Sequence, residues 1–359
     1  QQGRPVRKGI TWLDGRSGTA CNDWETSGLL TEIDDFTGYH TFPGVGPLTL
    51  FYWFKDNDPN ILKAGYKNLW AKDWIKFMLT GIAATDETDP SNGHFKRGER
   101  TFSRELFKML GIEKYWNLLP EIIPSWQVMG KVTKAAADLT GLKIGTPVAS
   151  GAWDVSSTSL GAGCVDEGQA LSILGTGGIH LAVSSFAPDA KGERYSICNH
   201  CVPDRWVINS MAMTATANLD WFIREHCQAD KSEADTTGRN IFEVINEKVG
   251  ASTIGANGIL FLPFLQGERA PFLKTTARGV FFGMTDASRR GDMLRSIFEG
   301  VAFSTRHNYE TVERAIPINE VVLAGGGSKS KQWSQIISDC TNKPMHIVAG
   351  EEFGALGAA

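Results

Sequence analysis

A single carboxylate, Asp154, stands in the otherwise uncharged stretch PVASGAWDVSSTSLGAG, which spans residues 147–163. An aspartate between an apolar strand and a helix can cap that helix by accepting its first backbone N–H groups. It can equally act as a general base, because open α/β sheets bind their ligands at the carboxyl ends of their strands. The stretch by itself leaves both interpretations open.

Two glycine-rich turns follow apolar strands further along the chain. Their sequences are Gly175-Thr176-Gly177-Gly178 and Gly325-Gly326-Gly327-Ser328. Glycine lets backbone N–H groups approach a phosphate closely, and the second turn also opens a helix, whose N-terminus favours anions. A purely structural tight turn uses glycine as well. Neither turn has the Gly-Lys-Ser/Thr of a P-loop or the spacing of a dinucleotide-binding motif.

We expect an α/β sheet to position these residues. From Gly145 onward, short apolar strands alternate with helices and small-residue turns, which is the pattern of such a sheet. We expect strands within 169–178, 180–185, 205–211, 258–265 and 344–350, and a strand, turn and helix within 320–333. Helices are expected over 215–228, 240–249 and 290–314, with a last helix opening at the C-terminal end.

The preceding part of the chain is richer in aromatic residues and less regular. We expect a short strand and a polar turn within 8–16, a helix that starts at Asp58-Pro59, and a strand followed by a helix within 68–81. Residues 86–100 are interpreted as a polar loop, and helices are expected over 103–110 and 131–139. A domain boundary is expected near residues 145–151.

Composition narrows the class of protein. A chain of 359 residues favours two domains, and 42% hydrophobic and 21% charged residues are ordinary for a globular protein. A net charge of −4 with no basic stripe indicates no nucleic-acid partner, and no apolar run is long enough to indicate a membrane partner. Six cysteines predict a reduced, cytoplasmic protein. Cys198 and Cys201 form half of a zinc motif without a second half, so no metal site is predicted.

The segment GVFFGMTDASRRGDMLRSIFEGVAF, residues 279–303, closely resembles the C-terminal signature of the FGGY family of carbohydrate kinases. Four further segments resemble motifs of that family in the same order. ITWLDGR resembles its sugar-site segment, GAWDVSSTSLGAG its catalytic-aspartate segment, ILGTGG its second phosphate motif and LAGGGSKSKQW its adenosine motif. FLPFLQGERAPF resembles the loop between the two lobes. Within this family, the sequence segments are most similar to those of xylulose and L-xylulose kinases.

This resemblance implies an α/β fold of the two-domain actin-like ATPase (ribonuclease H-like) type. Each domain would have a mixed sheet flanked by helices, and the cleft between the domains would hold a sugar and ATP with Mg²⁺. Residues 1–148 would form the remainder of a sugar-binding domain, and residues 149–359 an ATP-binding domain. A homodimer is a possible assembly.

The resemblance also implies roles for single residues. Asp154 would accept the proton of the sugar hydroxyl that attacks the γ-phosphate, and its apolar neighbours should desolvate it and raise its pKa. Residues 175–178 would contact the γ-phosphate, residues 326–328 would pass close to the adenosine, and residues 266–269 could help to close the cleft. The sugar-binding residues implied are Trp12, Asp14, Arg16, Asp154 and Val155.

Three departures from the family pattern bear on these expectations. Leu50 stands where the family's N-terminal signature has a lysine, and Val155 stands where an asparagine or glutamine often binds the sugar. The family's first phosphate motif, Asp-x-Gly-Thr, does not occur. We therefore expect the chain to be an internal fragment, without the first hairpin and the last helices, that is inactive alone.

The leading prediction is ATP-dependent phosphorylation of a small sugar, most similar to a pentulose such as xylulose. An alditol kinase of the erythritol or glycerol type is the alternative within the family. A catalytically incompetent protein that binds sugar or nucleotide is a second class, and a scaffold protein a third. A scaffold would not need Asp154 beside two phosphate-type turns.

Overall fold

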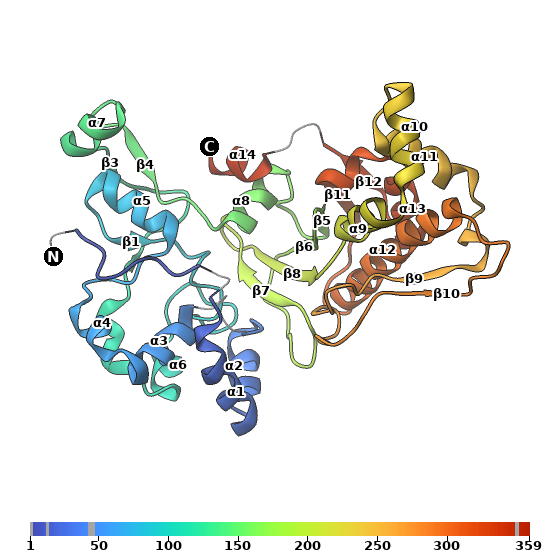
Figure 1. Ribbon diagram of the computed structural model, residues 1–359. Helices are drawn as coiled ribbons and strands as arrows, with labels where there is room; N and C mark the ends of the chain where they lie inside the picture. The colour runs from blue at the N-terminus through green and yellow to red at the C-terminus, as the bar shows by residue number, and fades with distance from the viewer. Residues whose placement is uncertain (1–2, 12–13, 42–46, 349–351) are drawn as a thin grey trace.

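The computed structural model describes residues 3–11, 14–41, 47–348 and 352–359. Figure 1 shows two lobes, and the chain passes from the N-terminal to the C-terminal lobe between strand β4 (Pro147–Ala149) and helix α8 (Asp154–Gly161). Asp154 is therefore the first residue of the helix that follows the crossing.

A six-stranded mixed sheet forms the centre of the C-terminal lobe, in the order β12-β11-β5-β6-β8-β7. Strand β11 runs parallel to both β5 and β12, whereas β6, β8 and β7 each run antiparallel to their neighbours. Because β5 and β11 are parallel, the glycine turns after them lie at the same edge of the sheet. The strands are β5 (Gln169–Leu174), β6 (Gly178–Ser184), β7 (Ser196–Asn199), β8 (Trp206–Ala212), β11 (Glu320–Ala324) and β12 (Met345–Ile347).

Helices cover both faces of this sheet. Leu171 and Ile173 of β5 pack in the cluster that contains residues of α8 and of α14 (Phe353–Ala358), whereas Leu174 packs with α12 (Arg290–Glu313). This split follows from the alternation of side chains along a strand. The other helices of this lobe are α9 (Thr216–His226), α10 (Gln228–Thr237), α11 (Ile241–Ala251) and α13 (Lys331–Thr341), with 3-10 turns η3 (Ala256–Gly258) and η4 (Gly326–Lys329).

The long helix α12 is anchored by residues of the segment that resembles the family signature. Asp292 accepts hydrogen bonds from the side chains of Ser252 (2.6 Å) and Asn257 (2.7 Å), and Glu299 accepts one from the backbone of Gly255 (3.0 Å). A Cβ on Gly300 would collide with a carbonyl of the strand β9 (Leu260–Leu262), which pairs with β10 (Val280–Phe282). The signature therefore fixes the packing of α12.

Short helices around an aromatic cluster build most of the N-terminal lobe. Trp24, Ile33 and Phe107 are buried in it. Two two-stranded sheets complete the described part of this lobe, parallel β1-β2 and antiparallel β3-β4. The elements are α1 (Gly18–Ser27), α2 (Leu29–Thr37), α3 (Pro47–Asn57), α4 (Pro59–Ala64), α5 (Ala71–Thr80), α6 (Arg104–Met109), α7 (Lys134–Thr140), η1 (Gly15–Ser17), η2 (Glu113–Leu118), β1 (Ala84–Thr85), β2 (Glu121–Ile122) and β3 (Val128–Lys131).

Most expected elements are present where local signals were strong. Helix α4 begins at Pro59 after Asp58, and α5 ends at Gly81, whose φ of 75° is the left-handed conformation of a helix end. The strand expected within 8–16 was wrong for the described part of that range. Helix α7 starts three residues later than expected, because β3 extends to Lys131. Helix α10 was not expected.

Strand β7 joins the two lobes through polar contacts. The Ile197 N–H donates to the Gly38 carbonyl at 2.7 Å, and the Asn199 N–H donates to Ser91 Oγ at 3.0 Å. The Asn199 side-chain amide donates to the Glu87 carbonyl at 3.1 Å. These bonds fix one edge of the sheet against residues 84–95, the segment of the N-terminal lobe that is buried throughout.

Candidate functional site

The two predicted glycine turns lie against each other at the end of the sheet. A Cβ on Gly325 would lie 2.7 Å from the carbonyl oxygen of Leu174, and a Cβ on Gly327 would lie 2.8 Å from the Leu174 Cβ. Leu174 directly precedes the first turn. Glycine is therefore required at both positions of the second turn for the two turns to approach each other.

The first turn is tied to the start of α9. The Gly175 carbonyl accepts hydrogen bonds from the backbone N–H (2.9 Å) and the hydroxyl (2.8 Å) of Thr216, and the Thr176 carbonyl accepts one from Ala215 N–H (2.8 Å). Gly177 and Gly178 pack against the end of β8, where a Cβ on either would lie within 3.4 Å of neighbouring atoms. Thr176 is the exposed residue of the turn.

A cavity of about 450 Å³ lies between this turn and α9. Thr176 and Gln266, both expected near the cleft, line it together. Sequence reasoning missed its other lining residues, which are Thr214, Ala217, Asp220, Trp221, Arg224 and Leu265. The sequence signal that could have identified this lining is the pair of Asp220 and Arg224, which are four residues apart on α9 and therefore lie on one face of the helix. Burial raises the pKa of Asp220, and Arg224 opposes that shift.

The second turn has one open residue. Gly326 is exposed, and a Cβ added there would have no heavy atom within 4 Å. Gly327 and Ser328 are buried, and the Ser328 hydroxyl donates to the Gly325 carbonyl at 2.8 Å. Gly326 is thus the residue of this turn with free space around its Cα, whereas Ser328 uses its hydroxyl inside the turn.

Asp154 is exposed at the first position of α8. Its Oδ1 accepts the N–H of the next residue, Val155, at 2.8 Å, and Trp153 occupies the cap position without a capping side chain. A negative charge in the first turn of a helix is favourable. The expected desolvation of Asp154 is wrong, because the residue is exposed although its neighbour Val155 is half-buried. Val155 is half-buried and packs in the cluster of Ile173 and Ile179, which flank the first glycine turn.

Three of the four residues before Asp154 are hydrogen-bonded to the N-terminal lobe. Lys76 Nζ donates to the Ser150 carbonyl, and Gly151 N–H donates to the Ser125 carbonyl at 3.0 Å. The Trp153 N–H donates to Thr88 Oγ1 at 2.6 Å. The backbone that leads into α8 is therefore fixed by three separate elements of that lobe.

One of these residues, Lys76, belongs to a largely buried ionic cluster. Lys72 forms ion pairs with Asp73 (2.8 Å), Asp86 and Asp89 (2.8 Å), and Lys76 pairs with Asp73 at 2.9 Å. Burial raises the pKa of Asp89 to about 6, against the attraction of Lys72. Residues 86–100 were interpreted as a polar loop, and the cluster was missed. The sequence signal for the cluster was the pair of Lys72 and Lys76, which lie one helical turn apart on α5.

The described residues of the expected sugar segment form a pair with each other. Arg16 donates two hydrogen bonds to the Asp14 carboxylate, at 2.8 and 2.7 Å, and its guanidinium lies 5.5 Å from the centre of the Trp53 ring. The hydrogen bond from Arg16 lowers the pKa of Asp14 to about 2. Leu50 is half-buried against the aromatic cluster. Trp12 lies outside the described residues.

Cys198 and Cys201, the two cysteines of the partial zinc motif, each contact another polar group. Cys198 Sγ contacts Asn92 Oδ1 at 3.2 Å, and Cys201 Sγ contacts the Ser156 carbonyl at 3.6 Å. All six cysteines are free thiols. Within the described ranges, no three His, Cys, Asp or Glu side chains gather as a metal site, and no helix is long and apolar enough to cross a membrane.

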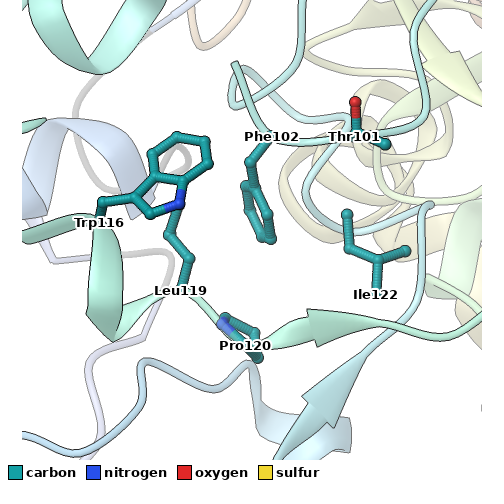
Figure 2. Close-up of a pocket in the computed structure, with 6 residues that line it drawn as sticks. All are labelled: Thr101, Phe102, Trp116, Leu119, Pro120 and Ile122. Atoms are coloured by element: carbon teal, nitrogen blue, oxygen red, sulfur yellow. The ribbon is translucent and has the colours of Figure 1, made fainter. Parts of the chain in front are cut away.

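A second cavity, of about 370 Å³, lies in the N-terminal lobe and contains none of the predicted site residues. Figure 2 shows the rings of Phe102 and Trp116 on one side of it and Ile122 on the other. Thr101, Leu119 and Pro120 complete its lining. No charged side chain of the described residues lines it, whereas Asp220 and Arg224 line the cavity beside Thr176, which is therefore the better candidate.

Comparison with known proteins gives a consistent result along the chain. Residues 1–161 match the FGGY family of carbohydrate kinases, N-terminal domain, and residues 170–359 match the C-terminal domain of that family. A xylulose kinase from Staphylococcus xylosus is 30% identical over 100% of this chain and 72% of its own length. An erythritol kinase from Brucella abortus is 32% identical, over 84% of this chain and 58% of its own length.

The solved structure of a xylulose kinase from Rhodospirillum rubrum matches with a TM-score of 0.84 at 25% identity, covering 96% of this chain and 68% of that chain. The two-domain actin-like α/β fold implied by the resemblance is thereby confirmed. The chain belongs to the FGGY family of carbohydrate kinases, phosphotransferases that use ATP as the phosphate donor.

Proposed function

We propose that this protein phosphorylates a pentulose such as xylulose, with Asp154 as the general base. The observation that carries the proposal is the position of Asp154, exposed at the start of α8, while Val155 packs against the same apolar cluster as Ile173 and Ile179 of the strands on either side of the first glycine turn. The name of the Staphylococcus xylosus relative supports a pentulose as the substrate.

The proposed reaction needs one proton acceptor. Asp154 takes the proton of a sugar hydroxyl while that oxygen forms a bond to the γ-phosphorus of ATP, and the bond from this phosphorus to the bridging oxygen of ADP breaks. Phosphoryl transfer depends mainly on positioning and charge neutralisation. The three hydrogen bonds that hold residues 150–153 would supply the positioning of this carboxylate.

The nucleotide would lie along the end of the sheet. Thr176 and the glycines around it would contact the γ-phosphate, and Gly326 has the free space that close approach of the adenosine requires. Arg224 lines the cavity beside Thr176 and would neutralise phosphate charge.

Mg²⁺ is proposed as the companion of ATP. The cavity beside Thr176 suits it, because Mg²⁺ is usually held by substrate phosphates with one or two carboxylates, and Asp220 is a carboxylate of that lining. Bound there, the ion would neutralise the charge that develops on the phosphates.

The sugar site is proposed around Asp14 and Arg16. Because these two side chains already bond to each other, a sugar hydroxyl would bind to the free edges of the pair. Val155 would contribute no polar contact, since its side chain packs on the sheet. We also propose that Trp12 would line the sugar site.

The first experiment measures ADP release by the purified protein with Mg-ATP across ketopentoses, tetritols, pentitols and glycerol. A signal that depends on a ketopentose supports the proposal. The alternative is an alditol kinase, which the 32% identity to an erythritol kinase favours, and it predicts a signal with a tetritol instead. Silence across the panel with ATP binding intact would indicate a binding protein without turnover.

The role of Asp154 is tested by Asp154→Asn, with the exposed Asp138→Asn as the matched control. We expect the first substitution to lower kcat at least about 100-fold, the usual contribution of a general base, with ATP binding nearly unchanged. The control should keep wild-type kcat. A decrease of less than about tenfold in Asp154→Asn would refute the role as base.

A cellular location and an oligomeric state are also proposed. A cytoplasmic location is supported by the six free thiols, because reduced cysteines are typical of that compartment. A homodimer is kept as a proposal, and light scattering of the purified protein tests it.

A further inference from the structure

A row of polar side chains crosses the interior of the C-terminal lobe. Ser172 of β5, His180 of β6 and Ser210 of β8 are direct cross-strand partners, and Asn308 and Tyr309 of α12 face them. Each of the five is at most 2% exposed. Apolar clusters lie to both sides of the row, and a buried polar group needs a hydrogen-bond partner.

Three of these side chains form a hydrogen-bonded chain. The Ser172 hydroxyl bonds to Tyr309 OH and, at 2.9 Å, to His180 Nδ1. The rings of His180 and Tyr309 also meet edge to face, with centres 5.5 Å apart and planes at 90°. Helix α12 is thereby joined to both strands that flank the first glycine turn.

The other end of the His180 ring faces that turn. A Cβ added to Gly178, the last residue of the turn, would lie 3.2 Å from His180 Nε2. The ring therefore lies directly against the base of the turn, and Gly178 leaves the space that it occupies.

The hydrogen-bond chain favours one tautomer of His180. Burial lowers the pKa of His180 to about 4, so the ring is neutral near pH 7 and carries one N–H. If Tyr309 OH donates to Ser172 Oγ, the Ser172 hydrogen is donated to Nδ1, and both hydroxyl hydrogens have an acceptor. The ring hydrogen then lies on Nε2, toward Gly178.

We propose that His180 is a positioning residue for the phosphate turn, held by Ser172 and Tyr309 with its Nε2–H against Gly178. The inference rests on the proposed function, in which residues 175–178 contact the γ-phosphate. It implies that loss of the chain weakens the use of ATP more than the use of the sugar, because the sugar site lies on other elements.

The test combines a spectroscopic and a kinetic measurement on His180→Phe and Tyr309→Phe. The control is Tyr195→Phe, because Tyr195 is a buried tyrosine of the same lobe whose hydroxyl bonds to the Asp189 carbonyl at 2.8 Å, outside this chain. Long-range ¹H–¹⁵N spectra of the histidine rings report which nitrogen carries the hydrogen. In the wild type we expect Nε2–H on His180, and in Tyr309→Phe a population with Nδ1–H.

The kinetic expectation is a rise of about fivefold or more in KM for ATP in both variants, the size of one lost hydrogen bond, with KM for the sugar changed by less than about twofold. The control should change neither. Nδ1–H in the wild type, or an unchanged KM for ATP in both variants, overturns the proposal. Should His180→Phe not fold, Tyr309→Phe decides alone. If neither the wild type nor the Tyr195→Phe control binds ATP, the proposed function itself is overturned.

Discussion

The end of the sheet and the segment 84–95 both lie close to the candidate site, yet they are built in opposite ways. At the end of the sheet, glycines let two turns approach until backbone contacts backbone, and hydrogen bonds are made by main-chain groups. At the segment 84–95, charged side chains of the segment and of α5 neutralise one another, and the carboxylates of Asp73 and Asp86 are fully buried.

This difference predicts different responses to substitution. A turn in which glycine backbones contact other atoms tolerates no side chain at those glycines, but it contains no charge that must be neutralised. An ionic cluster tolerates changes of shape but not the loss of one partner, because an unpaired buried charge is costly. Substitutions with matched controls can separate the two cases.

The largest expected effect is that of Lys76→Met in the ionic cluster. It leaves Asp73 and Asp86, both fully buried, without one of their cations, and it frees the Ser150 carbonyl. We expect a loss of about 3–5 kcal/mol in the free energy of unfolding, measured by urea denaturation. Lys134→Met, which breaks the exposed pair with Asp138, should cost at most about 0.5 kcal/mol. Equal losses would contradict a buried cluster.

Gly325→Ala is the corresponding change at the end of the sheet. The φ of Gly325 is 87°, and the added Cβ would meet the Leu174 backbone, so we expect a loss of about 3 kcal/mol in unfolding free energy. The neighbouring Gly326→Ala has open space and should lie within about 1 kcal/mol of the wild type. It should nevertheless weaken ADP binding in a calorimetric titration if the turn contacts adenosine. Similar stability losses in both variants would contradict the contact with Leu174.

The same contrast explains what could be predicted from sequence. Strands β5 and β11, their turns and α12 were recognised because their signals are local: apolar runs, glycines at strand ends and helical periodicity. The ionic cluster was not, because Lys72 and Asp86 become partners only through the fold. Val155 shows the same limit, since its packing against an apolar cluster beside the sheet also depends on the fold.

A smaller effect, visible only in acid, is expected from His94 in the segment 84–95. Its ring packs among the rings of Trp70, Phe102 and Phe107, and burial lowers its pKa to about 4 from an unfolded value near 6.5. The unfolded chain therefore binds more protons between these values, and the stability contribution, complete above pH 6.5, is lost as the pH falls toward 4.

The change to make is His94→Phe. It should make the pH dependence of the unfolding free energy shallower by up to about 1.4 kcal/mol per pH unit in this window, measured by urea denaturation at several pH values. Parallel pH curves for the variant and the wild type would show that His94 is not buried as a neutral ring.

The smallest stability effect is expected where the segment contacts the start of α8. Thr88→Val removes the hydroxyl that accepts the Trp153 N–H and also donates to the buried Asp86 carboxylate, so we expect a loss of about 2 kcal/mol. Thr85→Val is the matched control, since Thr85 is equally buried and its hydroxyl has no hydrogen-bond partner in the described chain. If Asp154 is positioned through this contact, Thr88→Val should lower kcat several-fold with little change in either KM, while Thr85→Val keeps wild-type kcat. An equal change in both variants would show that the segment supports the fold without positioning the carboxylate.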